Sequence, residues 1–193
     1  HASMAIYNAW CDHTPVMVMG GTGPMNSSKR RPWIDWIHTA QVQGNLVRDF
    51  VKWDDQPVGG EAFPSSIMRG YRIAMSDPGG PVYLCFDVSD QEAAIEKEIP
   101  LPDPSRFRPP APLQADYDAI KEAAQLLATA QNPVILADYV GRNNDAVLSL
   151  VALADLLSIP VIDFGARLNF PNTHSLNLTG KNRELIANAD VIM

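Results

Sequence analysis

Apolar residues recur along the chain in two patterns, one with the spacing of an amphipathic helix and one with the continuity of a buried strand. At the beginning, apolar side chains at i, i+3, i+4, i+7 and i+8 predict a helix whose inward stripe is Ala2, Ala5, Ile6, Ala9 and Trp10. The apolar run 16–19 predicts a strand, which the glycines at 20, 21 and 23 end. A helix, a short turn and a continuous apolar strand are typical of a parallel sheet covered on both faces.

The same alternation continues to the end of the chain. We expect a strand at 50–53, a helix at 64–75 and a strand at 82–86, and later a helix at 116–130 and a strand at 134–137. A further helix has Val147, Leu150, Val151 and Ala154 inward, and a strand at 161–164, a helix at 182–189 and a strand from 190 follow. Strands that alternate with helices at this spacing predict an α/β fold with open, parallel, Rossmann-like sheets.

A proline-rich stretch divides this pattern in two. Between residues 99 and 112 stand the six prolines Pro100, Pro102, Pro104, Pro109, Pro110 and Pro112. Proline excludes helix interiors and most sheet positions, so we expect an extended linker at 97–112 between two α/β domains. The first helix is in register from its first turn and residues 190–193 begin a strand. We therefore expect the chain to be a piece of a longer protein, with both domains incomplete.

Composition narrows the class of partner. The 193 residues are 46% hydrophobic, yet no apolar run approaches the roughly 18 residues of a membrane span. The net charge is −7 with 15 Lys and Arg residues, which argues against a basic face for nucleic acid or anionic lipid. We expect small metabolites or proteins as partners. Cys11 and Cys85 lie in apolar surroundings without metal-type spacing, so we expect reduced core thiols, which fits a cytoplasmic protein.

Several blocks, in this order along the chain, together resemble the thiamine diphosphate-dependent enzymes of the acetolactate synthase type. They are HASMAIYNAWCDHTPVMVMGGTGP, KRRPWIDWIHTAQVQGNLVRDFVKWDDQP, PGGPVYLCFDV, the proline linker, NPVILAD and IPVIDF. The resemblance implies that 1–96 is the C-terminal part of the pyrimidine-binding domain and 97–112 the linker. It implies that 113–193 is a truncated, Rossmann-like (DHS-like) central domain.

The resemblance also implies a chemistry. Enzymes of this family use thiamine diphosphate and Mg²⁺ to decarboxylate or join 2-keto acids, and they build the site between subunits, which implies a homodimer or homotetramer. The family's cofactor-activating glutamate is expected before His1 and its GDG…N motif after Met193, so we expect the piece alone to be inactive. Acetolactate synthesis, benzoylformate-type decarboxylation and oxalyl-coenzyme A-type chemistry all remain open.

The resemblance singles out three candidate site residues. His1 falls where family members carry Asn or His near the pyrimidine ring, although a helix-capping role is the alternative. His38 and Thr39 fall in the segment that aligns loosely with the QEVD pattern on the substrate side of the cofactor, where a histidine could transfer a proton. The segment departs from QEVD, and a surface histidine in a long loop is the alternative. Gln41 and Gln43 are weaker candidates.

Two further clusters have competing explanations. Lys29, Arg30 and Arg31 could bind a phosphate or coenzyme A, but their Ser and Pro neighbours favour a solvated basic turn. Trp33 and Trp36, spaced i and i+3, could form an aromatic wall at a binding site, but burial against another subunit is favoured because large aromatic residues dominate interfaces.

A nucleotide-binding module, taking FAD or ADP, or a purely architectural α/β module is the alternative function. The turn at 21–23 lacks the third glycine of a dinucleotide loop. In the second domain, the turn 137–142 has one glycine and places Asp138 where a diphosphate would approach. We therefore expect this domain to be structural rather than to bind FAD, with Arg142, Arg167 and Lys181 as the cations that could reverse that expectation.

Overall fold

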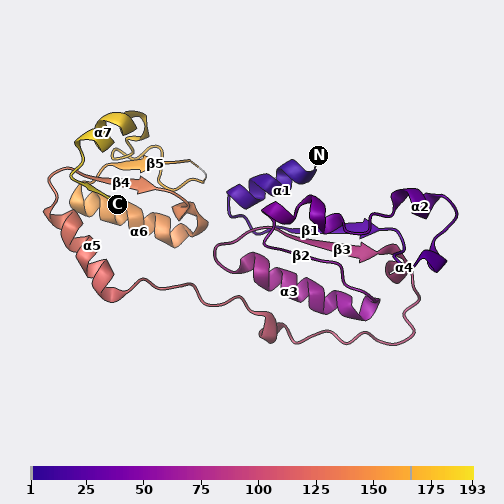
Figure 1. Cartoon of the computed structure of the whole chain (residues 1–193). Coiled ribbons are helices and arrows are strands. Elements are labelled where there is room, and N and C mark those ends of the chain that lie inside the picture. Colours follow the sequence, from indigo (N-terminus) through magenta and orange to yellow (C-terminus); the bar gives the residue numbers. More distant parts are fainter. Residues whose placement is uncertain (1, 166) are drawn as a thin grey trace. The chain divides into compact units, whose positions relative to one another are not determined.

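The computed structural model describes residues 2–165 and 167–193 and divides the chain into two compact units, His1–Pro112 and Leu113–Met193. The helices are α1 (Ala2–Cys11), α2 (Ile34–His38), α3 (Phe63–Met75), α4 (Val88–Gln91), α5 (Tyr117–Thr129), α6 (Asn144–Leu157) and α7 (Asn182–Asn188). The strands are β1 (Met17–Thr22), β2 (Trp53–Asp55), β3 (Val82–Asp87), β4 (Pro133–Ala137), β5 (Val161–Asp163) and β6 (Val191–Ile192) (Figure 1).

The first unit contains a parallel sheet in the order β1-β3-β2. Its central strand β3 pairs with β1 from Met17↔Val82 to Thr22↔Asp87, so the carboxyl ends of these two strands lie side by side. Val82 and Leu84 are fully buried, because helices cover both faces of the sheet. The continuous apolar sequence of β3 follows from this two-sided burial.

Figure 1 shows α1 and α3 on opposite sides of this sheet. On the α1 side, Ile6 packs with Val47 and Val51 in a small core. On the α3 side, the Phe63 and Phe86 rings meet edge to face with centroids 4.7 Å apart. These contacts fix the sheet, and with it the ends of its strands, between two layers.

The second unit repeats this plan with a parallel sheet in the order β5-β4-β6. Figure 1 shows α6 and α7 on opposite sides of it. Its core contains Leu127, Ile135, Ala137, Leu150, Ala154, Ile159, Val161 and Phe170. Phe170, from the loop after β5, is fully buried, so that loop is part of the core rather than a surface excursion.

The predicted fold class is confirmed, since both units have parallel sheets with flanking helices. The helices expected at 64–75 and 116–130 are confirmed to within one residue at each end. Two strand predictions need correction. β1 does not end at Gly20 but continues to Thr22, because the glycines pair with Cys85 and Phe86 of β3. The strand expected at 50–53 begins at Trp53, because Arg48–Phe50 form a 3₁₀ turn.

Three further observations differ from what the sequence pattern predicts, two in burial and one in backbone conformation. Of the stripe expected to be buried in α1, only Ile6 is buried, and Trp10 is 38% exposed. Cys11 is exposed at the end of that helix and is not the core thiol that we expected, whereas Cys85 is buried. The proline-rich stretch is not extended throughout, since Pro104–Phe107 form a 3₁₀ turn that contacts α3. None of the helices in the described residues is long and apolar enough to cross a membrane.

Candidate functional site

The carboxyl ends of β1 and β3 form the edge of the first sheet at which a ligand is expected. In open parallel α/β sheets, ligands bind in the crevice beyond the carboxyl ends of the strands. The connection from β1 to β2 leaves from this edge, and Figure 1 shows α2 and α4 beyond the ends of the strands. His38 and Thr39, the candidate catalytic residues, both lie in this connection.

Asp87 anchors the start of the connection. Its Oδ2 accepts a hydrogen bond of 2.8 Å from the Met25 amide, and its Oδ1 accepts bonds of 2.7 and 2.8 Å from the Ser89 amide and hydroxyl. Burial raises the pKa of this carboxyl, but the hydrogen bonds from Met25 and Ser89 outweigh burial and leave the pKa below its usual value. Asp87 is therefore an ionised, buried link between β3 and the residues after β1.

Asp35 holds α2 in the same way. It is buried, and its carboxylate accepts hydrogen bonds of 2.8 Å from the Arg31 amide and of 3.0 Å from both Nε and Nη2 of the Arg31 guanidinium. These bonds to Arg31 lower the pKa of Asp35. Arg31 also approaches Glu92, just after α4, at 3.9 Å. Arg31 thus links α2 to the residue that follows α4.

His38 and Thr39 lie at the end of α2. His38 is exposed, and the Thr39 hydroxyl donates a hydrogen bond to the Asp35 carbonyl. A Cβ atom built on Gly23 would lie 2.1 Å from the Thr39 Oγ1, so only glycine leaves room for this threonine beside the turn after β1. The structure therefore brings Thr39 to the edge of the sheet, with His38 beside it. Their catalytic role stays a prediction, and His1 lies outside the described residues.

Sequence reasoning missed the contacts that hold this segment, although it named Gln43 as a weaker candidate site residue. The Thr22 hydroxyl donates to the Ala40 carbonyl at 2.8 Å, and Gln43 bonds to both Gly21 and Tyr83. Asp87 could have been found, because a carboxylate directly after an apolar strand marks the carboxyl edge of a sheet. The bond between Gln43 and Tyr83 could not have been found, because no local pattern pairs a glutamine with a tyrosine forty positions away.

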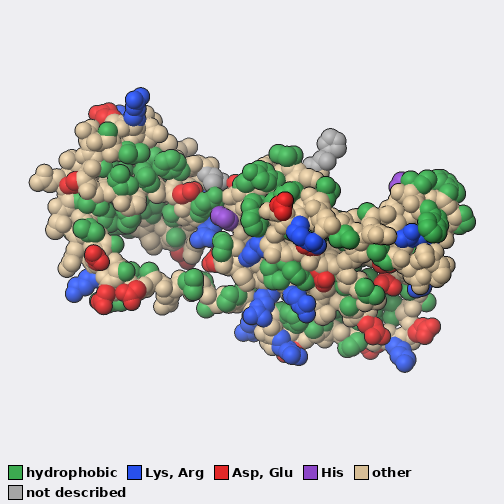
Figure 2. All heavy atoms as spheres, in the orientation of Figure 1, with side chains coloured by type: hydrophobic (Ala, Val, Ile, Leu, Met, Phe, Trp, Pro, Cys, Tyr) green, Lys and Arg blue, Asp and Glu red, His purple; other side chains and the backbone are tan. Residues whose placement is uncertain are grey.

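The basic cluster is more structured than a solvated turn. Arg30 Nε donates to the Pro24 carbonyl at 2.7 Å, and the Arg30 guanidinium lies 4.8 Å from the centroid of the Trp36 ring. With Arg31 paired to Asp35, two of the three cations are engaged within the chain. Trp33, Trp36 and Ile37 are 69%, 59% and 68% exposed. Figure 2 shows hydrophobic side chains gathered over the part of the surface that carries α2.

In the second unit, Leu168 and Asn169 occupy the space beside the turn that follows β4. The Gly141 amide donates to the Asn169 Oδ1 at 3.0 Å, and a Cβ atom at Gly141 would lie 2.5 Å from the Leu168 carbonyl oxygen. A flavin diphosphate on this turn would have to displace residues 167–169 and would also meet the exposed carboxylate of Asp138. The residues present do not fit FAD.

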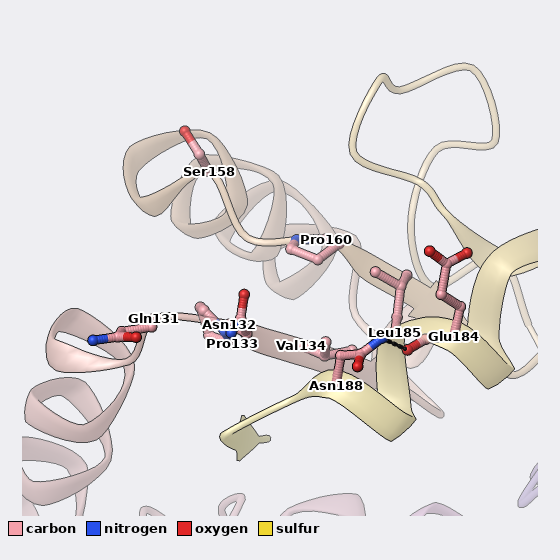
Figure 3. Close-up of a pocket in the computed structure, with 9 residues that line it drawn as sticks. All are labelled: Gln131, Asn132, Pro133, Val134, Ser158, Pro160, Glu184, Leu185 and Asn188. Carbon is pink, nitrogen blue, oxygen red and sulfur yellow. Dashed lines mark hydrogen bonds between the residues drawn. The ribbon is translucent and has the colours of Figure 1, made fainter.

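Figure 3 shows a cavity in the second unit, of about 210 Å³, with residues of β4, Ser158 and Pro160 before β5, and α7 around it. The prolines at 133 and 160 place it at the amino ends of β4 and β5, the opposite edge from the usual ligand crevice. Asn188 Nδ2, which could face a ligand, donates to the Glu184 carbonyl at 2.9 Å instead. We therefore place the candidate site in the first unit.

Known proteins with similar sequences and structures indicate the family to compare this chain with. Residues 120–193 match the family described as thiamine pyrophosphate enzyme, central domain. The chain is 31% identical to the probable acetolactate synthase large subunit of Methanocaldococcus jannaschii and 25% identical to the benzoylformate decarboxylase of Pseudomonas aeruginosa. These alignments cover 90% and 89% of the chain but 29% and 32% of the relatives. The crystal structure of benzoylformate decarboxylase from Polynucleobacter necessarius superposes with a TM-score of 0.72 and 28% identity, over 91% of this chain and 32% of that one.

The chain is thus similar to thiamine diphosphate-dependent enzymes in both of its units. The expectation from the sequence blocks is thereby confirmed at the level of the family. The chain spans about a third of the length of the curated relatives that it matches. Within residues 2–165 and 167–193, no group of three His, Cys, Asp or Glu side chains is placed to hold a metal ion.

Proposed function

We propose that this chain is part of a thiamine diphosphate- and Mg²⁺-dependent enzyme that decarboxylates or joins 2-keto acids. One observation carries the proposal: the similarity to acetolactate synthase and benzoylformate decarboxylase runs through both units in one order, over about nine tenths of the chain. The names of these relatives describe reactions on 2-keto acids, and the 2-keto acid class is the part of their chemistry that they share.

We assign residues 1–96 to the C-terminal part of the pyrimidine-binding domain, 97–112 to the linker and 113–193 to the central domain. The division of the structure between Pro112 and Leu113 supports this assignment, as does the central-domain match over 120–193. The parallel sheet of the first unit, with its connection folded over the carboxyl edge, is the form expected of a cofactor-binding half-site.

Thiamine diphosphate, when bound, supplies the nucleophilic carbon and the electron sink for breaking the bond next to the ketone. In our proposal this chain orients the substrate side of the site. The imidazole of His38 is exposed, and its proposed role is proton transfer with the substrate. The Thr39 hydroxyl proton is committed to the Asp35 carbonyl, which leaves its oxygen as an acceptor. Asp35 and Asp87 hold the backbone on which both residues stand.

We also propose that the enzyme is a homodimer or homotetramer. The support is the apolar surface of Trp33, Trp36 and Ile37 beside the candidate site, since contiguous exposed apolar side chains mark interaction surfaces. Light scattering after size-exclusion chromatography of the complete enzyme should give the mass of a dimer or a larger oligomer. Trp36→Ser combined with Ile37→Ser should shift the mass toward the monomer, whereas Tyr71→Ser, on an exposed part of α3, should not.

The function is tested with the protein encoded by the complete gene, supplied with thiamine diphosphate, Mg²⁺ and a panel of pyruvate, benzoylformate and glyoxylate. We expect release of carbon dioxide or a carboligation product that depends on thiamine diphosphate. We expect residues 1–193 alone to show no turnover. Absence of turnover by the complete protein with every 2-keto acid of the panel would overturn the proposal.

A further inference from the structure

We propose that Gln43 and Tyr83 form a positioning pair that fixes the segment with His38 and Thr39 on the carboxyl edge of the first sheet. Neither side chain need touch a substrate for this role. The inference rests on the proposed function only for its effect on catalysis, and its structural part can be tested on the chain itself.

Two hydrogen bonds connect three separate elements. The Tyr83 hydroxyl, on β3, donates to the Gln43 Oε1 at 2.8 Å, and the Gln43 Nε2 donates to the Gly21 carbonyl, on β1, at 2.8 Å. Gln43 begins the 3₁₀ turn Gln43–Leu46 in the connection between β1 and β2. The glutamine amide therefore clamps this connection to the two neighbouring strands whose carboxyl ends form the site.

The surroundings fix the direction of both bonds. If the amide were reversed, its oxygen would face the Gly21 carbonyl oxygen, and two acceptors would meet. The amide oxygen must therefore face Tyr83, which makes the tyrosine the donor. Burial raises the pKa of Tyr83, so its hydroxyl keeps its proton well above neutral pH. The clamp is thus specific to an amide and a phenol.

Gly20 is what lets the tyrosine reach across β1. A Cβ atom at position 20 would lie 2.1 Å from the Tyr83 Oη and 3.2 Å from the Gln43 Oε1. The backbone angle φ of Gly20 is not positive, unlike that of Gly59 and Gly165. Glycine is therefore needed at position 20 because it has no side chain, and not because of its conformational freedom.

The clamp acts on the candidate catalytic segment through a short stretch of backbone. Thr39 is bonded to the Asp35 carbonyl at one end, Ala40 accepts from Thr22 in the middle, and Gln43 holds the other end. Loss of the Tyr83 hydroxyl would remove one of the two hydrogen bonds at Gln43 and leave the attachments at Thr39 and Ala40 in place. We therefore expect a looser segment rather than an unfolded unit.

The structural test is hydrogen exchange of residues 38–46 in the 193-residue chain, read by mass spectrometry. Tyr83→Phe should speed exchange in this segment about tenfold, the loss expected for one hydrogen bond. Gln43→Leu, which removes two hydrogen bonds, should speed it at least as much, and exchange in α5 should be unchanged in both variants. Tyr71→Phe is the matched control and should behave as wild type. Wild-type exchange at 38–46 in both variants would overturn the inference.

The catalytic test uses the complete enzyme with its cofactors and its best 2-keto acid. Tyr83→Phe should lower kcat about tenfold and Gln43→Leu at least as much, with thiamine diphosphate affinity unchanged. The double variant should lose no more than Gln43→Leu alone, because Gln43→Leu already removes both bonds of the clamp. A larger loss in the double variant than in Gln43→Leu, or wild-type kcat in Tyr83→Phe, would overturn the positioning role. If the wild-type protein turns over no 2-keto acid, the proposed function fails, and hydrogen exchange still decides whether the clamp exists.

Discussion

The carboxylate of Asp163 shows how much a single side chain can organise in this protein. Its Oδ1 accepts hydrogen bonds of 2.8 Å from the Gly165 amide and the Asn169 side chain, and its Oδ2 accepts from the amides of Asn169 and Phe170 at 3.1 and 3.3 Å. Burial raises the pKa of this carboxyl, but the hydrogen bonds from Asn169, Gly165 and Phe170 outweigh it and lower the pKa overall.

This lowered pKa predicts an acid-sensitive second unit. A carboxyl whose pKa is lower in the folded state contributes stability above its unfolded pKa, near 4, and loses it as the pH falls through the folded value. Asp163→Asn should therefore lower the free energy of unfolding of the second unit by about 1–3 kcal/mol at pH 7. The variant should also lose less of that free energy than the wild type when the pH falls below 4. Urea denaturation at pH 7 and at pH 3 measures the two effects. Asp138→Asn, the same change at an exposed position, should leave both unchanged, and an unaltered pH slope in Asp163→Asn would contradict the prediction.

A second prediction at this scale concerns His38. If its exposed imidazole transfers a proton during the reaction, His38→Ala in the complete enzyme should lower kcat about 100-fold, with substrate KM nearly unchanged. Asn45→Ala, another exposed residue of the same connection, should retain wild-type kcat. Steady-state kinetics with the preferred 2-keto acid gives both numbers. A wild-type kcat in His38→Ala would return His38 to the alternative of a surface histidine.

At the scale of the element, apolar spacing predicted the positions of the longer helices because local contacts decide them, but it did not predict the short helices α2 and α4. α3 and α6 carry their inward residues at helical intervals, and their positions follow from the pattern. The strands were less predictable. β1 runs through Gly20 and Gly21, where local rules place a turn, because pairing with β3 decides its length. The contacts of Thr39 with Gly23 and of Gln43 with Tyr83 depend on that pairing, so no pattern in the sequence indicates them.

The start of α5 offers a test of local energetics. Asp116 caps the helix, its Oδ1 accepting from the amides of Asp118 and Ala119 at 3.0 and 3.1 Å. Asp116→Ala should cost about 1 kcal/mol of stability in the second unit, the usual value of such a cap. Asp118→Ala removes the same charge from the first turn but no cap, and should cost about 0.5 kcal/mol or less. Equal losses in urea denaturation followed by circular dichroism would show that charge alone matters.

At the scale of the whole molecule, the connection between the two units is the most accessible stretch of chain. Leu113 is 96% exposed, directly after the last proline of the linker. Chymotrypsin cleaves after exposed large apolar residues, so brief digestion should cut first after Leu113 and leave two resistant products. Intact mass spectrometry identifies the cut, and Leu113→Gln should delay it. A first cut within α3 or α6 would show that the units are less compact than the structure indicates.

The division into two units also has an optical consequence. All four tryptophans, at positions 10, 33, 36 and 53, belong to the first unit. Fluorescence excited at wavelengths selective for indole therefore reports on the first unit alone. The far-ultraviolet circular dichroism signal, in contrast, comes from the backbone of both units. Trp33 and Trp36 flank the segment that leads to His38, and the Arg30 guanidinium lies over the Trp36 ring. Without any added label, the chain thus carries its own fluorescent reporter beside the edge where its cofactor and substrate are proposed to bind.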